Sequence, residues 1–146
     1  MRILVIDGQG GGIGKQLVRA LQEADIAATT VACGTNDEAA RGMKKAGAQE
    51  AYFGENAIVR ECGTADIITG PVGIVMPGAI AGEVTAAVAR AVASSGAMRV
   101  LVPIGKCNTL VAGATQGNLS HYIAEAARLV VALCEEKCRR NADGEK

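Results

Sequence analysis

Residues 2–15 read RILVIDGQGGGIGK, in which a short apolar run leads into five glycines within the seven positions Gly8 to Gly14. The apolar run has the length and the β-branched content of a buried strand. Leu17 and Leu21 follow at helical spacing, so we expect a helix to begin within the glycine segment. Each glycine inside a helix or strand costs roughly 0.5–1 kcal/mol. So dense a run is expected to let the backbone approach a ligand closely.

The order of strand, loop and helix recurs along the chain. Short β-branched runs that alternate with longer amphipathic stretches are typical of βα units around a parallel sheet. We therefore expect one α/β domain at 1–140, a Rossmann-like open and mostly parallel sheet of five or six strands with helices on both faces, followed by a flexible tail at 141–146. The predicted strands are 2–6, 27–33, 49–53, 65–69 and 99–104, with a sixth, antiparallel edge strand at 109–114, and the predicted helices are 13–24, 37–46, 55–62, 80–94 and one from 119.

A glycine-containing loop follows each predicted parallel strand, with the sequences DGQGGGIGK, GTN, GEN, GPVG and GKCN. In an open α/β sheet, ligands bind beyond the carboxyl ends of the strands, where such loops converge and helix N-termini point at the ligand. The five loops therefore predict a binding site at this edge of the sheet.

A phosphate is the ligand group that this edge suits best. Glycines permit close backbone approach, and a helix N-terminus offers free N–H groups and a positive partial charge. Lys15 supports the prediction, because a cation in the first turn opposes the helix dipole unless an anion lies there. We predict binding of a phosphate-bearing nucleotide, with NAD(P) as the expected cofactor, through Asp7, Gly8, Gln9, Gly10, Gly11, Gly12, Ile13, Gly14, Lys15, Gly34, Thr35, Asn36, Gly70, Pro71, Val72 and Asn108.

The glycine spacing distinguishes between known phosphate loops. It matches neither G-x-G-x-x-G nor the P-loop pattern in any frame. Gly8, Gly12 and Gly14 fit G-x-x-x-G-x-G, which resembles the coenzyme loop of short-chain dehydrogenases. The resemblance covers only the first strand, loop and helix. It does not carry the dehydrogenase activity, because the Tyr-x-x-x-Lys pair of that family is absent: Tyr52 is followed by Asn56, and Tyr122 by Ala126.

Most of the chain is similar to a small uncharacterised bacterial family, domain of unknown function 3842. The segments that carry this resemblance are VIDGQGGGIGK, GTN, AGAQEAYFGENAIV, GPVGIV and PIGKCN. The resemblance implies a Rossmann-like domain and implies no established reaction.

The end of the second predicted strand, CGTN, lacks the carboxylate that usually binds the ribose 2′-hydroxyl of a dinucleotide. Thr35 and Asn36, with Arg41 or Lys44 nearby, would instead suit a 2′-phosphate, which favours the phosphorylated cofactor. The alternative is that Asn36 caps the next helix and that both cations are solvated surface residues.

Asp7 creates a conflict, because a carboxylate repels a phosphate. Two interpretations resolve it. Asp7 either accepts hydrogen bonds from backbone amides of the glycine loop, which we prefer, or holds Mg²⁺ against the phosphate, with Glu55 and Glu83 as the obvious further oxygen ligands. We predict no dedicated metal site.

Catalytic groups are harder to assign, and the sequence leaves open whether the protein is an enzyme. Cys107 lies between Lys106 and Asn108, where the ammonium would lower the thiol pKa and favour a nucleophile. Glu55 is a further candidate, since it follows the third predicted strand. The alternative is that these residues are ordinary surface or half-buried side chains without a catalytic role. His121, the single histidine, is expected in the first turn of the last helix as a surface or capping residue.

Composition excludes several other functions. The 15 basic and 15 acidic residues give no basic surface for nucleic acid, and two tyrosines and one phenylalanine give no platform for base stacking. Prolines and glycines interrupt the longest apolar stretch, which argues against a membrane span. An odd number of scattered cysteines indicates a reducing, cytoplasmic location.

A homo-oligomer is plausible for a domain of this size, because a partner copy can complete a site that one short sheet only half forms. Two alternatives to a nucleotide-dependent enzyme remain open. One is a non-catalytic sensor or interaction protein, and the other is a magnesium-dependent enzyme that acts on a mononucleotide or a phosphorylated metabolite.

Overall fold

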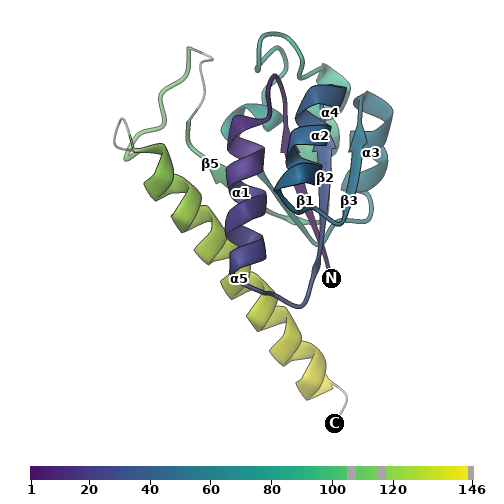
Figure 1. The fold of residues 1–146 in the computed structure, drawn as a ribbon, viewed down its shortest axis with the longest axis vertical. Helices are drawn as coiled ribbons and strands as arrows, with labels where there is room; N and C mark the ends of the chain where they lie inside the picture. Colours follow the sequence, from purple (N-terminus) through teal and green to yellow (C-terminus); the bar gives the residue numbers. More distant parts are fainter. Residues whose placement is uncertain (105–107, 115–117, 145–146) are drawn as a thin grey trace.

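The computed structural model describes residues 1–104, 108–114 and 118–144. In these residues the chain forms one sheet of five parallel strands in the order β3-β2-β1-β4-β5 (Figure 1). The chain first builds outward from β1 to β3 and then returns to the other side of β1 with β4. The predicted Rossmann-like α/β sheet is confirmed. The strands are β1 (Arg2–Asp7), β2 (Thr29–Gly34), β3 (Glu50–Phe53), β4 (Ile67–Pro71) and β5 (Met98–Val102).

Helices cover both faces of the sheet. One buried cluster joins the sheet to α1, α2 and α5, and a second cluster joins the opposite face to α3 and α4. Figure 1 shows α5 beside α1 along one side of the molecule. The helices are α1 (Gly12–Glu23), α2 (Asp37–Ala46), α3 (Glu55–Cys62), α4 (Ala86–Ser94) and α5 (Leu119–Gly144), and a short 3₁₀ helix, η1 (Val72–Val75), follows β4.

Strand β1 is the centre of the core. Its side chains alternate between the two faces, so that Ile3 and Val5 join the first cluster while Leu4 and Ile6 join the second. All four are at most 1% exposed. A strand covered by helices on both faces has an uninterrupted apolar sequence, and the run before the glycines has this character.

The predicted signals at the ends of α2 and α3 are confirmed. The Asn36 side chain accepts a hydrogen bond from the Ala39 N–H at 2.8 Å, so it caps α2. Gly47 ends that helix with a φ of +125°, a conformation that disfavours residues with a side chain. Helix α3 begins at Glu55 and ends at Cys62, as predicted.

The helix predicted at 80–94 is wrong over residues 80–85. Helix α4 begins at Ala86, after Thr85, whose hydroxyl oxygen accepts a hydrogen bond from the Val88 N–H. Before it, Ile80 and Ala81 have φ values of +54° and +52°. Such left-handed conformations interrupt a right-handed helix, so the segment folds as a loop that reaches over the sheet edge.

The predicted sixth strand at 109–114 is also wrong, because these residues form no strand and the sheet is parallel throughout its five strands. At the other end, helix α5 runs to Gly144, so the segment predicted as a tail from 141 is helical over its first four residues. The buried residues of α5 lie between Ile123 and Cys134, and its C-terminal part extends beyond the sheet (Figure 1).

A helix that crosses a membrane must be long and apolar. Among the described residues, none of the helices combines the necessary length and apolarity.

Gly70 provides a test of the packing between β1 and β4. A Cβ at this position would lie 2.2 Å from the Ile6 carbonyl oxygen, so Gly70→Ala forces the two central strands apart. We expect a loss of about 1–3 kcal/mol in the free energy of unfolding, measured by urea denaturation. Gly96→Ala is the matched control, because its new methyl group would meet open space. Equal stabilities of the two variants would contradict the tight contact.

Candidate functional site

A cavity of about 470 Å³ opens at the carboxyl ends of β1, β4 and β5. This position is the switch point of the sheet, where the chain goes to β2 on one side of β1 and to β4 on the other, and where open α/β sheets bind their ligands. The volume is within the range of about 300–1,000 Å³ typical of small-molecule sites. The lining residues are Asp7, Gly8, Gln9, Gly10, Gly11, Gly12, Ile13, Pro71, Gly73, Ala79, Ile80, Ala81 and Ile104.

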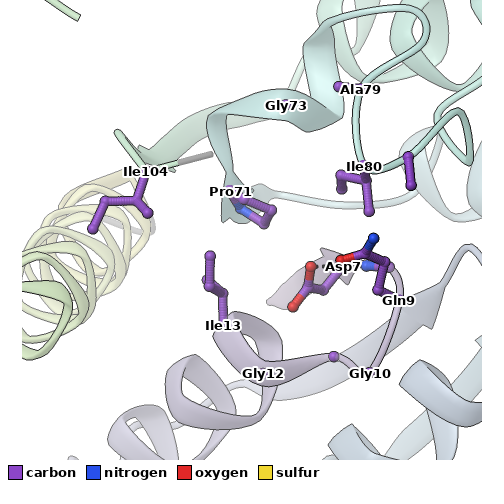
Figure 2. Close-up of a pocket in the computed structure, with 13 residues that line it drawn as sticks. Asp7, Gln9, Gly10, Gly12, Ile13, Pro71, Gly73, Ala79, Ile80 and Ile104 are labelled. Atoms are coloured by element: carbon purple, nitrogen blue, oxygen red, sulfur yellow. Dashed lines mark hydrogen bonds between the residues drawn. The ribbon is translucent and has the colours of Figure 1, made fainter. Parts of the chain in front are cut away.

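The two sides of the cavity differ in chemistry (Figure 2). The glycine loop, residues 8–12, forms one side and presents mainly backbone. Opposite it, Pro71, Ile80 and Ile104 supply an apolar surface, with Ile80 above Asp7 and Gln9 in the view of Figure 2. A ligand that fits both sides carries a polar or anionic group next to an apolar one.

Close packing explains two of the glycines in the loop. A Cβ at Gly8 would lie 2.5 Å from Thr35 Oγ1, and a Cβ at Gly14 would lie 2.4 Å from Met43 Sδ. These positions bring the loop against the end of β2 and helix α1 against α2. They require glycine for the fold, whether or not a ligand binds.

Gly10, Gly11 and Gly12 differ from these packing glycines. Gly11 has a φ of +71° at the N-terminus of α1, a conformation in which glycine is favoured. Gly10 and Gly12 have neither constraint, because a Cβ at either position would meet nothing within 4 Å. Both line the cavity, and no described residue accepts a hydrogen bond from their N–H groups. Packing therefore does not explain why these two positions are glycine.

Asp7 ends β1 and lies under the glycine loop. Its Oδ1 accepts a hydrogen bond from the Gly8 N–H at 2.8 Å, and its Oδ2 accepts one from the Gly14 N–H at 2.7 Å. The interpretation in which Asp7 bonds to loop amides is thereby confirmed. Burial raises the pKa of the carboxyl group, these hydrogen bonds oppose the rise, and the nearby Glu83 charge adds to it.

A second carboxylate, that of Glu83, holds the outer part of the loop. Glu83 Oε2 accepts a hydrogen bond from the Gln9 N–H at 2.8 Å, and Glu83 Oε1 accepts one from Asn36 Nδ2 at 2.6 Å. Asn36 Nδ2 also donates to the Gln9 carbonyl oxygen at 3.0 Å. One carboxylate thus connects the loops that follow β1 and β2 with the segment that follows β4.

Residues 78–83 form a loop, here called the 78–83 loop, that covers part of the site. Ile80 and Ala81 line the cavity in left-handed conformations that cost of order 1–3 kcal/mol each. The Ile80 side chain packs against Gly8, where an added Cβ would approach it to 2.8 Å. The helix predicted from residue 80 is therefore absent from this loop. Five lining residues are not among the predicted binding residues, and these are Gly73, Ala79, Ile80, Ala81 and Ile104.

Of the remaining predicted binding residues, Pro71 lines the cavity and the other described ones do not. Gly34 and Gly70 serve packing, since a Cβ at Gly34 would come within 2.4 Å of the Asn36 carbonyl oxygen. Val72 begins η1. Thr35 lies against Gly8, and its buried hydroxyl oxygen has no hydrogen-bond partner among the described residues.

Lys15 does not line the cavity. Its side chain lies along α2, where a Cβ at Gly42 would be 3.0 Å from Lys15 Cε. Any charge that Lys15 contributes to a bound phosphate therefore acts from outside the cavity.

Of the predicted catalytic residues, Glu55 alone lies in the part of the chain that the structure describes. Glu55 is exposed at the start of α3, and its Oε1 accepts a hydrogen bond from the Thr85 hydroxyl at 2.5 Å. Asn108 is exposed with a φ of +48°. Lys106 and Cys107 lie outside the described residues.

Cys33, near the end of β2, is fully buried. Burial raises the pKa of its thiol to about 12, so the thiol stays protonated at neutral pH. Cys33 is therefore a core residue and not a nucleophile. Among the described residues, no group of three or more His, Cys, Asp or Glu side chains is arranged to hold a metal ion.

The fold and the cavity place this chain among Rossmann-like proteins with an open parallel sheet and a pocket at its switch point. Residues 2–135 match the family model described as Domain of unknown function (DUF3842), and the chain belongs to that family. No curated protein sequence matches the chain.

The raised pKa of Asp7 leads to a pH-dependent prediction. An ionised Asp7 is less favourable in the native state than in the unfolded chain, so its ionisation lowers stability as pH rises from the ordinary pKa of 3.8 through the raised native value. The Asp7→Asn variant has no carboxyl group to ionise at this position, so it does not lose stability in this way. The stability of the variant relative to wild type is expected to increase with pH, as measured by urea denaturation between about pH 4 and about pH 8. A constant difference, or one that falls with pH, would contradict the assignment.

Proposed function

We propose that the protein binds a phosphate-bearing nucleotide, NAD(P) in the first instance, in the cavity between the glycine loop and β4. The observation that carries the proposal is the pair Gly10 and Gly12. Both are glycine without a packing or conformational reason in the described structure, both line the cavity, and both have N–H groups without an acceptor there. Both residues are exposed, so a phosphate would replace water as the acceptor, and its close approach would explain the absence of side chains.

The position of the loop supports the same proposal. Gly12 begins α1, so its N–H lies at the positive end of the helix dipole. Asp7 already accepts the N–H of Gly14, which leaves the outer N–H groups to the ligand. The anion that the loop accepts is therefore expected beside Gly10 and Gly12.

The apolar side of the cavity supports a nucleotide over a free phosphate. Pro71, Ile80 and Ile104 offer a surface that matches the flat, weakly polar rings of a base or a nicotinamide. A ligand that uses both sides would carry a ring system and a phosphate joined by a sugar. NAD(P) has this composition, and so do mononucleotides of similar reach.

A ligand panel tests the proposal. Thermal and urea unfolding are measured with NAD, NADP, FMN, ATP and sugar phosphates, each with and without Mg²⁺. A ligand at a hundred times its dissociation constant is expected to stabilise the native state by about 2.7 kcal/mol. Failure of every phosphate compound to stabilise the protein would overturn the proposal. Stabilisation that requires Mg²⁺ would favour the magnesium-dependent alternative.

Gly12→Ala separates ligand binding from folding. Since the added methyl group meets open space and alanine favours helices, stability is expected to stay equal or to rise by up to about 1 kcal/mol. Nucleotide affinity is expected to fall by about tenfold or more, because the methyl group occupies the phosphate position. Gly96→Ala, far from the loop in sequence and equally open, is the control that keeps wild-type affinity. Unchanged affinity in Gly12→Ala, measured by calorimetry, would exclude this loop as the phosphate site.

A further inference from the structure

We infer that Glu83 sets the nucleotide specificity of the site, selecting a ribose with free hydroxyls, as in NAD, over a ribose with a 2′-phosphate, as in NADP. This inference rests on the proposed function and specifies its ligand. It comes from the contact between Glu83 and Asn36, two residues that are 47 positions apart in the sequence.

The position of the Glu83 carboxylate is the first argument. In dinucleotide-binding sheets the adenosine ribose lies at the end of the second strand, next to the glycine loop, and a carboxylate there accepts its hydroxyls. Strand β2 ends at Gly34 and is followed by no acidic residue until Asp37. Glu83 supplies a carboxylate at this place from the 78–83 loop, because it bonds to both Gln9 and Asn36.

The chemistry of the carboxylate is the second argument. An ionised carboxylate only accepts hydrogen bonds and has room for about four, of which two are used by Gln9 N–H and Asn36 Nδ2. A ribose diol brings two donors and fits the remaining capacity. A 2′-phosphate brings no hydrogen-bond donor and about two negative charges, so the Glu83 carboxylate would repel it.

The basic residues nearby provide the third argument. Arg41 Nε pairs with Asp37 Oδ2 at 2.8 Å on its own helix, and Lys44 Nζ donates to the Gln49 carbonyl oxygen at 2.6 Å. These are the two cations that the sequence suggested for a 2′-phosphate, and each of them has a partner other than Asn36. Asn36 itself caps α2 through its Oδ1, and its Nδ2 donates to Glu83, so both the oxygen and the nitrogen of its side-chain amide already have partners.

Calorimetric titration of the full chain with NAD and with NADP tests the inference. Wild type is expected to bind NAD at least about tenfold more tightly than NADP. Glu83→Gln removes the charge and keeps the size and one acceptor oxygen, so the ratio is expected to fall below about threefold, mainly through tighter NADP binding. Glu38→Gln is the matched control, because it removes one negative charge from an exposed residue in the first turn of α2. It is expected to keep the wild-type ratio.

The possible outcomes separate this inference from the proposed function. If wild type binds neither dinucleotide, the proposal of NAD(P) binding fails. If wild type binds both equally, or NADP more tightly, NAD(P) binding stands and the specificity inference is overturned. A ratio that stays unchanged in Glu83→Gln also overturns it, since another group would then discriminate. If urea denaturation shows that Glu83→Gln does not fold, the ratio of NAD to NADP affinity in the wild type alone tests the inference.

Discussion

The hydrogen bonds that the Asp7 carboxylate accepts from Gly8 and Gly14 determine the geometry on which the rest of the site depends. They join the end of the central strand to the start of α1 and close the glycine loop between them. Because the carboxylate is buried, its charge is costly and the loop amides offset part of that cost. The first turn of α1 thereby has an internal anion. Asp7 and Glu83 engage the amides of Gly8, Gln9 and Gly14, and the Gly8 carbonyl accepts that of Gly11. The amides of Gly10 and Gly12 have no such partner among the described residues.

Two kinds of glycine are mixed in one short segment, and the structure separates them. Gly8 and Gly14 are required by packing, and Gly11 by its conformation. These three would be glycine in a protein with no ligand at all. A glycine-rich loop is therefore weaker support for a phosphate site than its glycine count indicates. The two glycines that the fold does not require, Gly10 and Gly12, are the ones that favour a ligand.

Much of the fold could be predicted because its signals are local. The β1 run, the Asn36 cap and the Gly47 stop each act within a few residues, and each is confirmed. The helix predicted at 80–94 was wrong over residues 80–85, because Val84, Val88 and Val92 keep helical spacing into a segment whose backbone is set by distant contacts. The contact between Glu83 and Gln9 spans 74 residues, and no periodicity reveals it. For the site, the sequence located Asp7 and the glycine loop and named Glu83 as a possible metal ligand, whereas the apolar side and the contact of Glu83 with the loop required the structure.

The Glu83 contact also bears on the order in which the molecule is assembled. The glycine loop is made within the first 15 residues, yet one of the carboxylates that hold it arrives only after β4. Since β4 pairs with β1, the 78–83 loop reaches the glycine loop only when that strand has docked. Contacts between such distant segments form late, because a long stretch of chain must first be ordered. The shape of the loop is therefore a property of the whole sheet, and a fragment that ends before β4 would contain the loop sequence without its final geometry.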